Sequence, residues 1–117
     1  MDARMVERRW ERRLLCADLV QIDWKCPEAK GSATALLEDI SPAGACLQTD
    51  VPLPVNAEIT VHHGRAALHG TISYCSYREI GYFTGITFEG RQRWSRKMFC
   101  PKHLVDPTSL QNRVIES

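Results

Sequence analysis

Apolar residues recur at every second position through much of this chain, and that spacing limits the possible folds more than any other feature. Such alternation is typical of β-strands that bury one side only. It begins over residues 14–24, where Asp18 is the polar exception on the apolar face. It returns over residues 57–61, 66–74 and 84–88. The sequence therefore predicts an all-β fold.

Turn-forming residues separate the alternating segments. The turn signals fall at residues 27–32, 41–44, 63–65 and 78–81. Connections this short join antiparallel neighbours, because parallel strands need a long crossover. At this spacing we expect about six short strands, arranged as a barrel or a sandwich.

Length and cysteine usage narrow the class of protein. The 117 residues suffice for one domain with its own core. No apolar run reaches the roughly 20 residues that a membrane-spanning helix needs. The five cysteines are odd in number and lack a C-x-x-C spacing, which argues against a disulfide framework or a zinc site. We therefore expect a cytoplasmic protein with no metal and no membrane insertion.

Charge is unevenly distributed, although the net charge is only +1. Residues 1–13 hold five arginines against three acids, and residues 14–90 hold nine acids against four bases. Residues 91–117 hold six bases against two acids. This distribution offers no long basic face for a nucleic-acid duplex. It favours a compact anion site near one end.

Arginines are concentrated just before the first predicted strand, in the sequence Glu-Arg-Arg-Trp-Glu-Arg-Arg at residues 7–13. The pattern Arg-x-x-x-Arg occurs twice, as Arg8/Arg12 and as Arg9/Arg13. A guanidinium group matches phosphate oxygens and the edge of guanine, and it also stacks on a base. A charge run by itself is more often a solvated face.

A second cluster, Asp-Ile-Ser-Pro-Ala-Gly at residues 39–44, ends the second predicted strand. Asp39 can accept hydrogen bonds from the N1–H and amino groups of a guanine, and Ser41 can donate or accept. Pro42 and Gly44 suit a tight turn. The alternative is an ordinary turn in which Asp39 and Ser41 bond only to nearby backbone.

Together, the two clusters make the chain similar to the PilZ domain family over about residues 7–100. That family carries the motifs Arg-x-x-x-Arg and (Asp/Asn)-x-Ser-x-x-Gly on a six-stranded antiparallel β-barrel. The resemblance implies that the ligand is cyclic di-GMP, which has two phosphates and two guanines. It assigns ligand-binding roles to Arg8, Arg9, Arg13, Asp39, Ser41 and Gly44.

The register of the arginine motif is open between two pairs. Arg9/Arg13 is favoured, because Leu14 then begins the strand on its inner face. If Arg8/Arg12 were the pair, the strand would start one residue earlier.

By resemblance, the protein is a stand-alone receptor and adaptor and not an enzyme, and it needs no cofactor. Its N-terminal arm swings onto the barrel when cyclic di-GMP binds, and this order–disorder switch signals to a partner protein. One alternative is a PilZ-like module that acts through protein contacts and does not bind nucleotide. Another is a small barrel that binds single-stranded nucleic acid, which ranks last because strand aromatics are few and the barrel body is acidic.

The resemblance also gives the layout of the chain. The four expected segments are a flexible arginine-rich arm at 1–13, a PilZ-type β-barrel at 14–90, a capping helix and following segment at 91–104 and a polar tail at 105–117. The helix itself is expected over residues 91–100. Trp94 and Met98 would then share one face, which would cover an open end of the barrel.

Other chemistry-bearing residues give weaker signals. His62 and His63 are adjacent on a predicted strand and so point to opposite faces, which disfavours a shared metal site. Tyr74 continues the apolar face of Leu68 and Ile72. Lining of the ligand pocket is one alternative for Tyr74 and Tyr77, but packing in the core or a solvent-facing ring is favoured. No serine, cysteine or threonine lies in a nucleophile motif with a nearby base.

Overall fold

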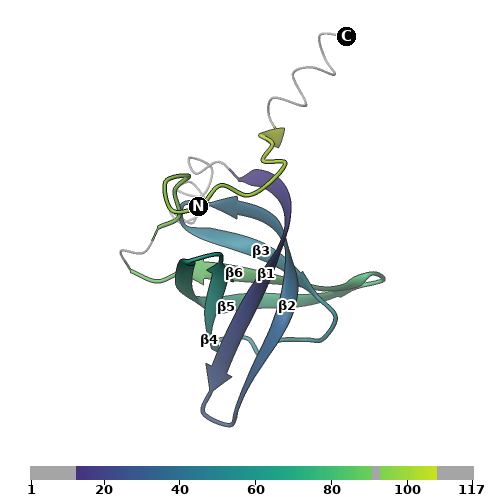
Figure 1. The fold of residues 1–117 in the computed structure, drawn as a ribbon. Helices are drawn as coiled ribbons and strands as arrows, with labels where there is room; N and C mark the ends of the chain where they lie inside the picture. Colours follow the sequence, from purple (N-terminus) through teal and green to yellow (C-terminus); the bar gives the residue numbers. More distant parts are fainter. Residues whose placement is uncertain (1–12, 91–92, 108–117) are drawn as a thin grey trace, which may run out of the picture.

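The computed structural model describes residues 13–90 and 93–107, which form a closed β-barrel with six strands (Figure 1). In chain order the strands are β1 (Leu14–Cys26), β2 (Ala29–Ser41), β3 (Gly44–Thr49), β4 (Glu58–His63), β5 (Ala66–Arg78) and β6 (Gly81–Phe88). Their order around the barrel is β1-β2-β3-β6-β5-β4, and every neighbouring pair is antiparallel. The predicted all-β, six-stranded antiparallel barrel is confirmed. The predictions for residues 1–12, 91–92 and 108–117 lie outside the described residues.

The β1–β2 hairpin extends well beyond the barrel wall (Figure 1). Both strands are 13 residues long, longer than the short strands that the sequence predicts. The turn is confined to Pro27 and Glu28, so residues 29–32, predicted as part of a turn, belong to β2. Trp24 of β1 pairs with Gly31, and a Cβ on Gly31 would come within 2.7 Å of the indole ring. The glycine therefore leaves the ring room to cover the extended hairpin.

Alternate residues of the strands point into the barrel and form its core. On β1, Val20 and Ile22 are buried between exposed neighbours, and on β6 the predicted inner residues Thr84, Ile86 and Phe88 are all buried. The largest fully buried side chains are Ile22, Leu37, Ile40, Leu47, Ile59, Leu68, Ile72, Val20 and Thr84. Removing this apolar surface from water is the main favourable term in folding.

The predicted face of Tyr74 is wrong. The pairing of β5 with β6 shifts register between Ile72 and Tyr74, which marks a β-bulge. An extra residue at a bulge reverses which side of the sheet the following side chains face. Ile72 therefore stays fully buried, whereas Tyr74 lies on the outside of the barrel opposite Gly85 and is 42% exposed.

The predicted helix over residues 91–100 is also wrong in its described part. Residues 93–106 contain turns but no helix. Trp94 is buried in the core cluster whereas Met98 is 41% exposed, so the two side chains do not share a face. The backbone N–H of Trp94 donates to the carbonyl of Pro42, at 2.9 Å. Contacts with the barrel therefore replace the hydrogen bonds of a helix.

Residues 93–105, here named the closing segment, cross one end of the barrel (Figure 1). Trp94 and Phe99 are part of the core cluster. This agrees with the prediction that Trp94 covers an open end of the barrel. Further along, the backbones of Leu15 and Val105 exchange two hydrogen bonds of 2.7 and 2.8 Å. The segment thus closes the barrel as irregular chain.

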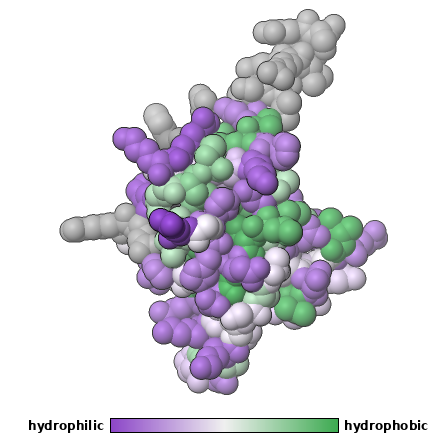
Figure 2. Space-filling view, viewed as in Figure 1, coloured by the Kyte–Doolittle hydropathy of each residue, from purple (hydrophilic) through white to green (hydrophobic). Residues whose placement is uncertain are grey.

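Most of the face drawn in Figure 2 is hydrophilic, with apolar residues gathered near its middle and on the projecting β5–β6 hairpin. Ile80 and Tyr77 at the tip of that hairpin are 70% and 69% exposed, and Leu19 of β1 is 73% exposed.

Within the part of the chain that the structure describes, no helix has the length and apolar character to cross a bilayer.

Candidate functional site

A shallow depression lies on the outer surface of the barrel, where the β2–β3 turn meets strands β5 and β6. Its volume is about 130 Å³. It is lined by Arg13, Ser41, Ala43, Gly44, Ala45, Ser73, Tyr74, Gly85, Ile86 and Thr87. Three of the six residues assigned by the motifs, Arg13, Ser41 and Gly44, therefore meet at one place. Arg8 and Arg9 lie outside the described residues.

Gly44 forms part of the floor of the depression because β6 passes very close to it. A Cβ at this position would lie only 2.3 Å from the carbonyl oxygen of Ile86, which is backbone and cannot swing away. The neighbouring carbonyl of Ala43 accepts a 2.8 Å hydrogen bond from the N–H of Phe88. The motif glycine is therefore required by packing between the turn and β6.

Asp39 lies on β2 opposite Cys46 of β3, and it is half-buried beside the depression. Burial raises the pKa of its carboxyl, while the charge of Arg13 and a hydrogen bond from the backbone N–H of Cys46 act in the opposite direction. Leu15, two residues after Arg13, pairs with Asp39 across the β1–β2 ladder, which places the Arg13 chain next to this strand. A carboxylate that is desolvated in this way favours any ligand that donates hydrogen bonds to it.

Ser41 is buried, and its hydroxyl donates a 3.3 Å hydrogen bond to the carbonyl of Gly44 across the turn. Ser41 and Asp39 thus make the local backbone bonds of an ordinary turn. Ser41 nevertheless lines the depression as well, with one oxygen that retains acceptor capacity.

Tyr74 lines the depression, which was one of the alternatives for it, and it contacts Cys46, a residue that no sequence motif assigns to the site. The Tyr74 hydroxyl donates to Cys46 Sγ at 3.8 Å, and the tyrosine ring covers Gly85, where a Cβ would lie 2.0 Å from a ring carbon. Desolvation raises the pKa of both groups, with Asp39 acting in the same direction. The glycine in β6 is the sequence signal that could have indicated a ring packed at this position.

A larger groove, of about 690 Å³, lies over β1, β2, β4 and β5 and contains none of the motif residues. On this face Asp23 accepts from the hydroxyl of Ser32 at 2.6 Å and is hydrogen bonded to His62 at 2.8 Å. These two hydrogen bonds lower the pKa of Asp23. The carboxylate lies between the hydroxyl and the imidazole, so the imidazole is not placed to activate the serine as in a Ser–His–Asp triad.

The histidines of β4 point to opposite faces, as predicted. His62 is bonded to Asp23 on the outer face, whereas His63 lies 2.8 Å from the buried carboxylate of Asp18. On β5, His69 lies 2.9 Å from the hydroxyl of Thr60. Over residues 13–90 and 93–107, no group of three or more potential metal ligands comes together.

Two comparisons with known proteins were negative. No protein-family model matches the chain, and no curated protein matches it.

Proposed function

We propose that this chain binds cyclic di-GMP at the depression formed by Arg13, Ser41, Gly44 and Tyr74, with Asp39 at its margin. One observation carries the proposal: residues of the two motifs, Arg13 on one side and Ser41 and Gly44 on the other, line the same depression although they lie about 30 positions apart in the sequence. A cation beside a desolvated carboxylate offers opposite charges to a ligand that is anionic at its phosphates and a hydrogen-bond donor at its guanines.

The proposed contacts follow from the chemistry of each group. The Arg13 guanidinium presents a planar set of donors that suits a phosphate or the O6 and N7 atoms of guanine. Asp39 accepts from the N1–H and amino groups of the same base or its partner. The exposed face of Tyr74 offers a surface on which a base can stack.

The volume of the depression supports entry of only part of such a ligand. At about 130 Å³ it is smaller than the roughly 300–1,000 Å³ typical of complete small-molecule sites. Under the proposal, one guanine enters and the phosphates lie over the rim. Arg8 and Arg9, which the first motif assigns to the ligand, lie outside the described residues.

The proposed role is that of a cytoplasmic PilZ-type receptor and adaptor, without catalytic activity. Ligand binding would bring the arginine-bearing arm onto the barrel, and the changed surface would then be recognised by an effector protein. Arg13 is the described residue from which such a movement would start.

Titration calorimetry tests the proposal directly. The wild-type protein is expected to give saturable heat with cyclic di-GMP and much less with cyclic di-AMP or GTP. Arg13→Ala and Asp39→Asn are each expected to weaken binding by at least about 10-fold, because each removes charged hydrogen bonds. Asp23→Asn, which alters a carboxylate outside the depression, is the matched control and should bind as the wild type does. An absence of saturable heat with the wild-type protein would reject the proposed function.

The raised pKa of Asp39 predicts that this residue costs stability in the free protein. Ionisation of Asp39 is less favourable in the folded than in the unfolded state, so its penalty begins as pH rises past the unfolded pKa and reaches its full size above the folded pKa. Asp39→Asn should therefore raise the free energy of unfolding at about pH 7, and the gain should disappear near pH 3, where both states are protonated. Urea denaturation at the two pH values measures the difference, and a variant less stable than wild type at neutral pH would contradict it.

A second candidate function is a PilZ-like module that recognises a protein without nucleotide. Its support is the exposed pair Tyr77 and Ile80 on the projecting β5–β6 hairpin. Capture of the same partner with and without cyclic di-GMP separates the two functions, because only the receptor would change its binding on addition of the nucleotide.

A further inference from the structure

The closing segment is hydrogen bonded at its beginning to the turn that carries the second motif. The N–H of Trp94 donates to the carbonyl of Pro42 at 2.9 Å. Pro42 lies between Ser41 and Gly44, both of which line the depression. A displacement of the closing segment would therefore free one side of the candidate site.

At its other end the closing segment is paired with the chain that carries Arg13. Val105 and Leu15 exchange two backbone hydrogen bonds, of 2.8 and 2.7 Å, and Leu15 follows Arg13 by two residues. Leu15 is also the β1 residue that pairs with Asp39. The closing segment thus connects the chain at Arg13 with the turn at Pro42, the two parts of the protein that form the proposed ligand site.

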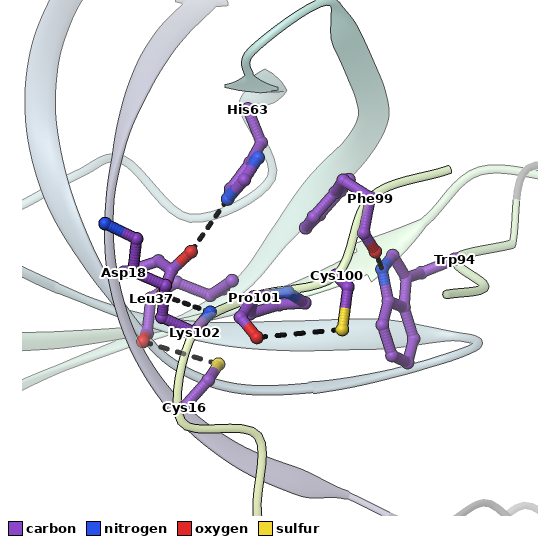
Figure 3. A network of polar contacts seen from close by, with 9 residues as sticks. All are labelled: Cys16, Asp18, Leu37, His63, Trp94, Phe99, Cys100, Pro101 and Lys102. Carbon is purple, nitrogen blue, oxygen red and sulfur yellow. Dashed lines mark hydrogen bonds and ion pairs between the residues drawn. The ribbon is translucent and has the colours of Figure 1, made fainter. Parts of the chain in front are cut away.

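Between these two attachments, a buried carboxylate holds the segment to the barrel (Figure 3). Asp18 is only 6% exposed, and its Oδ1 accepts the backbone N–H of Lys102 at 2.7 Å. Its Oδ2 lies 2.8 Å from His63 Nε2, and the His63 ring stacks on Phe99 with centroids 4.3 Å apart. The carbonyl of Phe99 in turn accepts from Trp94 Nε1 at 3.1 Å. One side chain of β1 therefore organises contacts along most of the segment.

Burying this carboxylate carries a desolvation cost that an apolar side chain would not. Burial raises the pKa of the Cys16 thiol to about 12, and the charges of Asp18, Asp39 and Glu38 act in the same direction. Two further carboxylates therefore lie in the region of Asp18. The two donors that Asp18 meets, a backbone N–H and an imidazole, fix the position of the segment more narrowly than apolar packing would.

We propose that Asp18 is a positioning residue for the ligand site, acting through the closing segment. The docked segment holds the Arg13 chain and the Pro42 turn in the arrangement that binds the ligand. Docking of the segment and occupation of the site therefore favour each other, and the two effects are equal by thermodynamic linkage. This inference rests on the proposed function and adds to it a regulatory element, since anything that draws the closing segment off the barrel would release the ligand.

Amide hydrogen exchange and cyclic di-GMP titration of the same proteins test the inference. In the wild type, saturating cyclic di-GMP should slow exchange at the Lys102 and Val105 amides by about 10-fold, although neither lines the depression. Asp18→Ala should speed exchange at both amides without ligand and weaken binding by about 10-fold. Asp18→Asn keeps an acceptor for Lys102 and should restore most of both properties. A merely structural Asp18 would leave exchange at these amides insensitive to the ligand.

A second variant guards against loss of the fold in Asp18→Ala. Val105→Pro removes the N–H that donates to Leu15, whereas Val105→Ala keeps it and serves as the control. The proline variant alone should bind cyclic di-GMP about 5- to 10-fold more weakly. If the wild type binds but both its amide exchange and the affinity of Val105→Pro are unchanged, the inference is overturned and the proposed function stands. If the wild type does not bind at all, the proposed function fails and the inference falls with it.

Discussion

Replacing Gly44 by alanine is expected to lower the free energy of unfolding by about 2–3 kcal/mol and to abolish most ligand binding. The new Cβ would collide with the Ile86 carbonyl at 2.3 Å, so β3 and β6 would have to separate where they form the floor of the depression. Chemical denaturation measures the first effect, and calorimetry with cyclic di-GMP measures the second. Wild-type stability in this variant would show that the close approach of β6 does not constrain the turn.

The matched control for this substitution is Gly64→Asn. Gly64 lies at the tip of the β4–β5 hairpin with φ +59°, and no atom lies within 4 Å of a Cβ built there. Asparagine tolerates this backbone conformation better than other non-glycine residues. Its cost should therefore stay below about 1 kcal/mol, with ligand binding unaffected.

The largest loss of stability is expected from Leu47→Ala. Leu47 is fully buried at the centre of β3, between Leu37 of β2 and Thr84 of β6. Its truncation removes apolar contacts and leaves a cavity, at a cost of about 2–5 kcal/mol. That is a large fraction of the roughly 5–15 kcal/mol by which folded domains are stable. Urea denaturation of both proteins measures the difference.

The same substitution at Leu19 is the control. Leu19 lies on β1, where its side chain is 73% exposed. Leu19→Ala should change the free energy of unfolding by no more than about 0.5 kcal/mol. Equal losses at Leu47 and Leu19 would mean that the barrel interior does not carry the stability.

The strands could be predicted because each depends on a local pattern. Alternation over β1 and β6 reflects the two-residue period of a strand, and the hairpin tips at residues 63–65 and 78–81 contain the residues that such turns require. Short connections then fix antiparallel pairing. The closure of the sheet into a barrel was implied by the family resemblance, since local patterns do not distinguish a barrel from a sandwich.

The departures from prediction come from contacts between residues distant in sequence. The bulge before Tyr74 depends on the pairing of β5 with β6. The alternation of apolar residues along β5 does not reveal it. The closing segment forms no helix because Trp94 bonds to Pro42, more than 50 residues earlier. Asp18, noted only as a polar exception, is explained once His63 and Lys102 are seen beside it.

The candidate site was predictable in part for the same reasons. The turn at Ser41–Gly44 is local, so its glycine and hydroxyl could be assigned from sequence. The nearness of the Arg13 chain to Asp39 follows from the pairing of Leu15 with Asp39, which lies next to a register shift in the β1–β2 ladder and could not be read from alternation alone. Tyr74 faces the depression only because of the bulge in β5, and Cys46 contacts it from β3.

The projecting β1–β2 hairpin contains the strand edge at which a strand from another chain could pair with this protein. A closed barrel offers no edge along its wall, but β2 is paired with β3 only from Leu36 onward, so its first seven residues have β1 alone as a neighbour. Lys25 and Lys30 face each other near the tip of that free margin. Lys25 is ion-paired with Glu58 at 3.9 Å, whereas Lys30 lies on the free margin itself, where its charge makes that edge a poor template for another chain.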